Sequence, residues 1–101
     1  MRMIVFFDLP TLTQKDLREY RYFRKFLLSN GFIMMQESVY SKLVLNNNSG
    51  NLIKKQLDKN LPSSGIVQIL TITERQFSEI EYLVGKSKSK IIDTIERVVE
   101  L

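Results

Sequence analysis

The pattern of apolar and polar positions begins with an uninterrupted apolar run from Met3 to Phe7. Asp8 follows this run directly, and Pro10 comes two residues later. An unbroken run of this length is typical of a strand that is buried on both faces. Proline cannot continue the strand, because it has no backbone N–H to donate. The sequence therefore predicts a central strand with a single carboxylate at its end.

The segment after this strand has the spacing of an amphipathic helix over residues 14–29, ended by Asn30-Gly31. Thr13, with Asp16 three residues later, is typical of a capping box at the start of a helix. The helix therefore does not need Asp8 as its cap. Its predicted inner face is apolar and consists of Leu17, Tyr20, Phe23, Leu27 and Leu28.

The outer face of this predicted helix carries a basic stripe at spacings of three and four residues, formed by Arg18, Arg21 and Lys25. A stripe of this kind is either a solvated helix face or a surface that contacts phosphates independently of sequence. Arg24 falls among the apolar positions. It is either a residue whose stem packs at the core edge or an ion-pair or phosphate ligand near a dimer interface.

The remaining chain alternates strand-like and helix-like patterns up to residue 84. It predicts strands at 32–36 and 38–45 with a break at Gln36-Glu37, a turn-rich loop at 46–50, a helix at 51–60, a second buried strand at 66–73, a short helical turn capped by Thr73, and an outer strand at 80–84. Ser38 begins the longer strand and is placed either to bind a phosphate or to bond the neighbouring loop. The tail fits both a helix and an edge strand.

The order β-α-β-β-α-β is that of an α+β ferredoxin-like sandwich. We expect residues 1–85 to form this domain, with an additional C-terminal strand, and residues 86–101 to form a tail. Two helices cover one face of such a sheet. Because the strands are almost continuously apolar, the other face should also be covered, and an added strand together with a second subunit would do this. The sequence therefore predicts a homodimer.

The composition narrows the chemistry that the chain can perform. With 101 residues there is room for one domain, and neither cysteine nor histidine is present. Their absence excludes disulfides, Ser-His and Cys-His nucleophiles, and the preferred zinc ligands. Catalysis would have to use carboxylates, Lys, Tyr or a metal with oxygen ligands. The net charge of +4 mildly favours an anionic partner.

The location of the protein is expected to be cytoplasmic. The chain has no apolar run long enough to cross a membrane, and Met1 leads directly into the first strand without a targeting segment. The absence of cysteine agrees with a reducing compartment.

Asp8 allows two interpretations at this point. It is either an Asx turn before Leu9-Pro10 or a metal ligand, since a carboxylate next to buried residues needs a compensating partner. One carboxylate is a poor metal site. Two Asp8 residues that meet across a dimer axis, with waters completing the shell, would form a plausible Mg²⁺ or Mn²⁺ site.

Several segments also carry a resemblance to a known family. They are IVFFDLP at 4–10, YFRKFLL at 22–28, GF at 31–32, QESVY at 36–40 and ILTITERQF at 69–77. In this order and spacing, they resemble the CRISPR-associated protein two family, and more narrowly its short form from type II systems. The resemblance extends from Met1 to about Gly85.

This resemblance implies a ferredoxin-like homodimer that acts in spacer acquisition during antiviral defence. The dimer would bridge two dimers of the CRISPR-associated protein one integrase in a heterohexameric complex and would support the double-stranded DNA that becomes a spacer. Asp8 would correspond to the family's Mg²⁺ ligand in metal-dependent endonuclease activity on RNA or double-stranded DNA. The tail would pair with the dimer partner or the integrase.

A second class of function is compatible with the residues alone. It is a small-molecule-sensing or oligomeric regulatory domain of the same fold, without a nucleic-acid partner.

Overall fold

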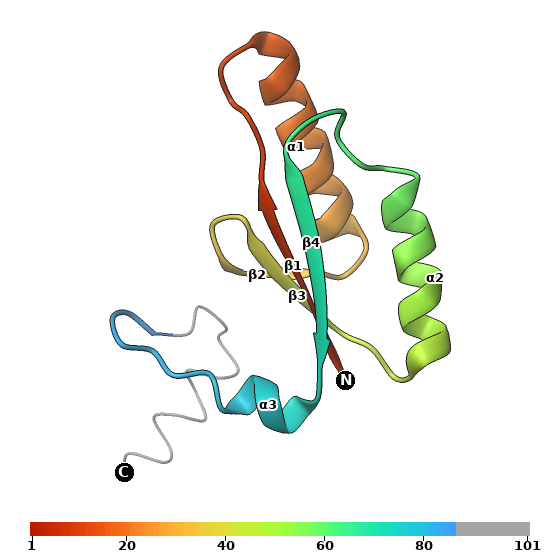
Figure 1. Cartoon of the computed structure of the whole chain (residues 1–101), viewed down its shortest axis with the longest axis vertical. Helices are drawn as coiled ribbons and strands as arrows, with labels where there is room; N and C mark the ends of the chain where they lie inside the picture. The colour runs from red at the N-terminus through yellow and green to blue at the C-terminus, as the bar shows by residue number, and fades with distance from the viewer. Residues whose placement is uncertain (87–101) are drawn as a thin grey trace.

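The helices and strands follow one another in the order expected of a ferredoxin-like fold (Figure 1). The computed structural model describes residues 1–86. The elements are β1 (Arg2–Asp8), α1 (Gln14–Ser29), β2 (Ile33–Gln36), β3 (Val39–Leu43), α2 (Asn47–Asp58), β4 (Ile66–Ile72) and α3 (Glu74–Ser78). The predicted α+β fold is confirmed.

β1 lies inside a four-stranded sheet of order β2-β3-β1-β4, in which every neighbouring pair is antiparallel. Val5 is opposite Tyr40 of β3 and Ile69 of β4. The sheet order leaves β2 and β4 at the two edges. The first strand therefore holds the central place that its unbroken apolar run predicts.

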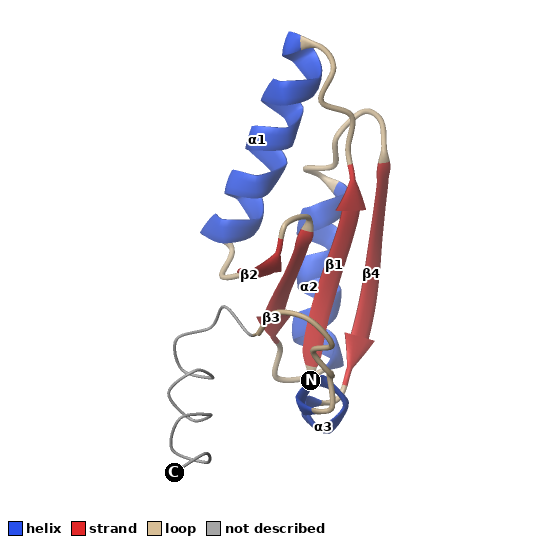
Figure 2. Cartoon of the chain, turned by 90° about the vertical axis from the view of Figure 1, so that its left-hand side faces the viewer, coloured by secondary structure: helices blue, strands red, loops and turns tan. Residues whose placement is uncertain are grey.

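The core lies between the sheet and the two long helices, which Figure 2 shows beside the sheet. Every second side chain of β1 faces the helices, and those of Met3, Val5 and Phe7 belong to this core. The Phe7 ring centroid is 5.3 Å from that of Phe23 and 6.0 Å from that of Tyr20. These edge-to-face contacts fix α1 on the end of β1 that carries the candidate carboxylate.

The start of α1 agrees with the prediction. The Thr13 hydroxyl accepts a hydrogen bond from the Asp16 N–H at 3.0 Å, and the Asp16 carboxylate accepts one from the Thr13 N–H at 3.1 Å. The predicted inner face is only partly right, because Leu28 is exposed and Phe26 packs against the core instead.

The prediction of a loop at residues 46–50 is wrong, because α2 begins at Asn47. Asn46 is its N-cap, and the Asn46 side-chain oxygen accepts a hydrogen bond from the Ser49 N–H at 2.9 Å. Asparagine is favoured both in turns and at helix N-caps, so that the run of asparagines indicated a loop where a helix starts. Gly50 is buried in this helix, and a Cβ placed on it would lie 3.5 Å from the Met3 side chain.

The prediction that residues 66–73 form a buried strand is also wrong within one chain. β4 is an edge strand, and the Ile66 and Leu70 side chains are 58% and 50% exposed. Residues 80–84 form no strand, and Leu83 is 91% exposed. The apolar composition shows that this strand needs cover, which residues 1–86 do not provide. The predicted tail pairing concerns residues that, from 87 onward, lie outside the described part.

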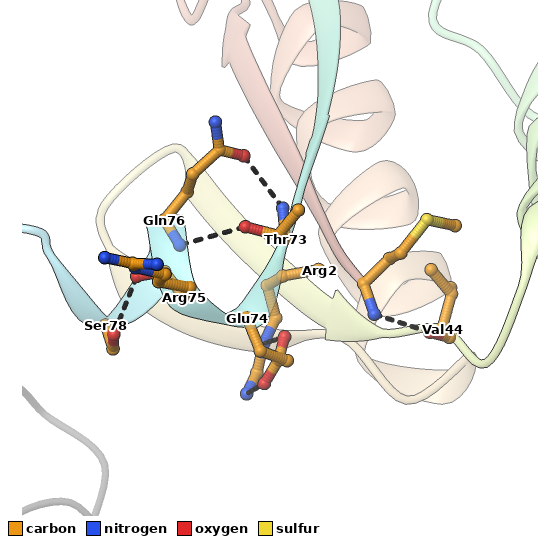
Figure 3. A network of polar contacts seen from close by, with 8 residues as sticks. Arg2, Val44, Thr73, Glu74, Arg75, Gln76 and Ser78 are labelled. Atoms are coloured by element: carbon orange, nitrogen blue, oxygen red, sulfur yellow. Dashed lines mark hydrogen bonds and ion pairs between the residues drawn. The ribbon is translucent and has the colours of Figure 1, made fainter.

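The predicted helical turn after β4 is confirmed as α3. Thr73 and Gln76 form a capping box, in which the Gln76 N–H donates to the Thr73 hydroxyl (Figure 3). The Arg2 guanidinium makes two hydrogen bonds to the Glu74 carboxylate, at 2.8 and 3.0 Å, and lies 4.3 Å above the Phe77 ring. Through these hydrogen bonds, Arg2 lowers the pKa of Glu74. They attach α3 to the start of β1.

A further expectation concerned membranes. Over residues 1–86, none of the helices is both long enough and apolar enough to cross a bilayer.

Candidate functional site

Asp8 is the last residue of β1 and is exposed. Successive side chains of a strand point to opposite faces, and the neighbouring Phe7 side chain lies in the core. Asp8 therefore belongs to the β1 positions that face away from the helices. On that face it is opposite Ile66 of β4. The candidate carboxylate therefore lies at one end of the sheet face that the two long helices leave open.

This open face is largely apolar. Four large apolar side chains on this face, from β2, β3 and β4, are between 50% and 58% exposed: Ile33, Leu43, Ile66 and Leu70. Leu70 is opposite Ile4 of β1, and Leu43 is opposite Arg2, so that the strands place these side chains on one continuous surface. Exposed apolar surfaces of this kind commonly mark an interface.

The two interpretations of Asp8 can be compared with its surroundings. Among the hydrogen bonds formed within residues 1–86, none involves the Asp8 carboxylate, so the Asx turn is not observed. The same residues contain no group of three or more carboxylates that could hold a metal ion. Within residues 1–86, Asp8 therefore belongs to no cluster of three or more carboxylates, and a complete Mg²⁺ site would need further ligands.

Gly65 fixes the backbone beneath the candidate carboxylate, and the sequence analysis did not single it out. Its φ is +94°, and a Cβ built there would lie 2.6 Å from the Asp8 carbonyl oxygen and 3.1 Å from the Leu9 Cα. Only glycine permits this approach without strain. The signal in the sequence was an isolated glycine directly before a predicted strand.

Ser38 lies near the same end of β1. Its carbonyl oxygen accepts a hydrogen bond from the Phe7 N–H at 3.0 Å, and its φ of 67° belongs to the tight turn between β2 and β3. The predicted break at Gln36-Glu37 corresponds to this turn and to an irregular register between Met34 and Gln36. The structure thus brings two of the predicted site residues, Ser38 and Asp8, to one end of the sheet.

The predicted basic residues lie elsewhere. Arg18, Arg21 and Lys25 are exposed on α1, which covers the opposite face of the sheet from Asp8. Arg24 is exposed as well, and it forms none of the ion pairs found within residues 1–86. A single chain therefore places the candidate basic side chains on the helical layer and the candidate metal ligand on the sheet, whereas Ser38 lies with the metal ligand.

Comparisons with known proteins agree with the resemblance seen in the sequence. The sequence profile of the family described as CRISPR associated protein Cas2 matches residues 1–80. A CRISPR-associated endoribonuclease Cas2 from Treponema denticola is 50% identical over 101 residues, covering 100% of both chains. Another from Streptococcus mutans is 48% identical, covering 100% of this chain and 93% of the relative.

A solved structure shows the same fold. The crystal structure of Streptococcus pyogenes Cas2 at pH 6.5 superimposes with a TM-score of 0.64 at 19% identity, covering 83% of this chain and 100% of the other.

Replacement of Gly65 by alanine tests how closely the loop supports Asp8. Gly85 is a matched control, because its φ is +81° but nothing lies within 4 Å of a Cβ placed there. Gly85→Ala should cost about 1 kcal/mol for the left-handed conformation. Gly65→Ala should cost about 2–4 kcal/mol, since crowding adds about 1–3 kcal/mol. Urea unfolding measures the loss in free energy of unfolding for each variant. Equal losses would show that the close approach of a Cβ at position 65 to the Asp8 backbone does not destabilise the protein.

Proposed function

Because the chain belongs to the CRISPR associated protein Cas2 family, we propose that it acts in spacer acquisition as a homodimer that bridges two integrase dimers. The dimer would hold the double-stranded DNA that becomes a spacer. The observation that carries this proposal is the open apolar face of the sheet with Asp8 at its end. The proposal concerns the scaffold role first and nuclease activity second.

The homodimer is supported by the free energy that the open face makes available. Four half-exposed apolar side chains per chain, eight in a dimer, would each contribute roughly 1 kcal/mol on burial. The sum of about 8 kcal/mol is similar to the cost of association, about 4–15 kcal/mol. The face alone would therefore give a marginal dimer, and more contacts are needed.

Residues 80–84 and β4 supply candidates for these additional contacts. Leu83 and Val84 are 91% and 94% exposed, and among residues 1–86 no strand pairs with the outer edge of β4. An exposed apolar segment and a free strand edge are each unfavourable in an isolated subunit. In a twofold dimer, both subunits contribute the same surface. The apolar segment and the β4 edge of each subunit would therefore be buried.

The dimer also gives Asp8 a partner. A twofold axis near the end of β1 would bring two Asp8 carboxylates together, and these, with waters, would hold Mg²⁺ or Mn²⁺. A bound ion would supply polarisation of a phosphate and activation of water. Ser38, at the same end of the sheet, would hydrogen-bond a phosphate of RNA or DNA there. The relatives are named endoribonucleases, and we propose endonuclease activity for this chain on that basis.

The basic stripe on α1 would contact the DNA backbone. Arg18, Arg21, Arg24 and Lys25 are exposed and lie on the layer opposite Asp8. Contacts from such side chains are sequence-independent and weaken with salt, as a scaffold for varied spacers requires. The alternative, a regulatory domain without a nucleic-acid partner, predicts no salt-dependent binding of a duplex.

Assembly with the integrase tests the scaffold role. The protein should co-purify with tagged integrase from the same cell, and a duplex of about 20–30 base pairs should stabilise the complex. Light scattering should give two integrase dimers for each dimer of this chain. Deletion of residues 91–101 should weaken the complex, and unchanged integrase binding would count against a role of the tail in this contact. Failure of the full chain to assemble, with and without duplex, would refute the bridging role.

The nuclease role is tested by Asp8→Asn. Cleavage of RNA and of duplex DNA should be Mg²⁺-dependent and should fall by more than about 100-fold, because even residues that support a metal ligand account for 10- to 100-fold. Glu79→Gln is the matched control, since Glu79 is an exposed carboxylate directly after α3 and outside α1 and α2. It should cleave as the wild type does. Equal activity of Asp8→Asn and wild type, in preparations free of other nucleases, would show that Asp8 does not carry the chemistry.

A further inference from the structure

The outer surfaces of α1 and α2 together carry most of the basic side chains found within residues 1–86. The cations of the two helices and of the residue after α2 are Lys15, Arg18, Arg21, Arg24, Lys25, Lys54, Lys55 and Lys59, and all are exposed. The same elements contain only three carboxylates, Asp16, Glu19 and Asp58. Of these cations, the sequence pattern pointed only to those of α1 as phosphate contacts.

A hydrogen bond joins the two helices inside this basic surface. The Tyr22 hydroxyl donates to the Asn60 side-chain oxygen at 2.6 Å, although Tyr22 is 58% exposed. On α1, Tyr22 lies between Arg18, four residues before it, and Lys25, three residues after it. Asn60 directly follows Lys59. The contact therefore brings the C-terminal end of α2 next to the α1 stripe.

A second contact holds the same junction. The Glu19 carboxylate accepts hydrogen bonds from the Ser63 hydroxyl at 2.9 Å and from the Ser63 N–H at 3.0 Å. The Ser63 hydroxyl is the main reason that the pKa of Glu19 is lowered. Asp16 is similarly engaged in the capping box of α1. Two of the three carboxylates are thus bound to the chain's own donors, while the cations remain directed to solvent.

The α2 lysines that extend this surface are one helical turn apart. Lys55 and Lys59 are four residues apart and lie opposite the buried Leu57 and Gly50 on the helical wheel. They continue the α1 stripe across the Tyr22–Asn60 contact. We call the set Arg18, Arg21, Lys25, Lys55 and Lys59 the basic band.

We propose that the basic band is one continuous contact surface for the phosphates of double-stranded nucleic acid, with Lys55 and Lys59 as binding residues. This inference rests on the proposed function and adds the second helix to it. Phosphate contacts made by cations on both helices would not depend on sequence, as support of varied spacer DNA requires.

An unpaired strand would suit the band less well. Single strands are held largely by stacking of bases on aromatic side chains. Among the aromatic side chains of α1 and α2, only Tyr22 is exposed, and its hydroxyl is bonded to Asn60. The chemistry therefore favours a duplex over a single strand.

The test compares the salt dependence of duplex binding among four proteins, the wild type and three variants. Lys55→Gln/Lys59→Gln should weaken binding and lower the slope of log K against log salt concentration by about two, roughly one for each lost phosphate contact. Arg75→Gln/Lys86→Gln removes two exposed cations outside α1 and α2 and should leave the slope unchanged. Circular dichroism should show that both variants retain the fold, since all four side chains are exposed.

The outcomes separate the inference from the function on which it rests. If the wild type shows no salt-dependent duplex binding, both are wrong. If Arg18→Gln/Arg21→Gln/Lys25→Gln weakens binding but Lys55→Gln/Lys59→Gln does not, the proposed function stands and the α2 contact is refuted. A single strand of equal length is the last comparison. If it binds the wild type as tightly as the duplex does, and its salt slope falls equally in Lys55→Gln/Lys59→Gln, the duplex assignment is overturned. Loss of integrase assembly with unchanged DNA binding would make α2 a protein contact and overturn the inference.

Discussion

Burial of both faces of β1 is the constraint on which the rest of the structure depends. Five apolar residues in a row give this strand two apolar faces, and the two long helices cover only one of them. The helices cover the face of Met3, Val5 and Phe7 through an aromatic cluster. The other face, shared with β3 and β4, keeps exposed leucine and isoleucine side chains. Both the proposed dimer and the location of Asp8 follow from this asymmetry.

The two layers of the molecule would serve different purposes. The open sheet face carries Asp8 and Ser38 at one end, so that chemistry at a phosphate depends on how two subunits meet. The helical layer carries the basic band, which needs no partner to be exposed to solvent. A protein organised in this way can support DNA even where it does not cleave it. The scaffold role and the nuclease role can therefore be tested independently.

The sequence predicted those parts of the fold that local chemistry determines. The apolar run of β1, the Thr13 capping box and the Thr73 cap are each fixed by a few neighbouring residues, and all were found. The start of α2 was missed because Asn46 suits a turn and a helix cap equally. The exposure of β4 was missed because apolar composition reports that a strand needs cover, not which chain provides it. Gly65 was missed because its partner, Asp8, is distant in sequence.

The central claim is that the open face joins two subunits, and the mass in solution tests it most directly. At micromolar concentration, sedimentation equilibrium should give twice the mass of one chain. Leu70→Lys, in the middle of the open face opposite Ile4, should give a folded monomer, whereas Leu45→Lys, 85% exposed and outside the strands, should remain dimeric. A monomeric wild type, or a Leu70→Lys variant that dimerises as tightly as the wild type, would contradict the account.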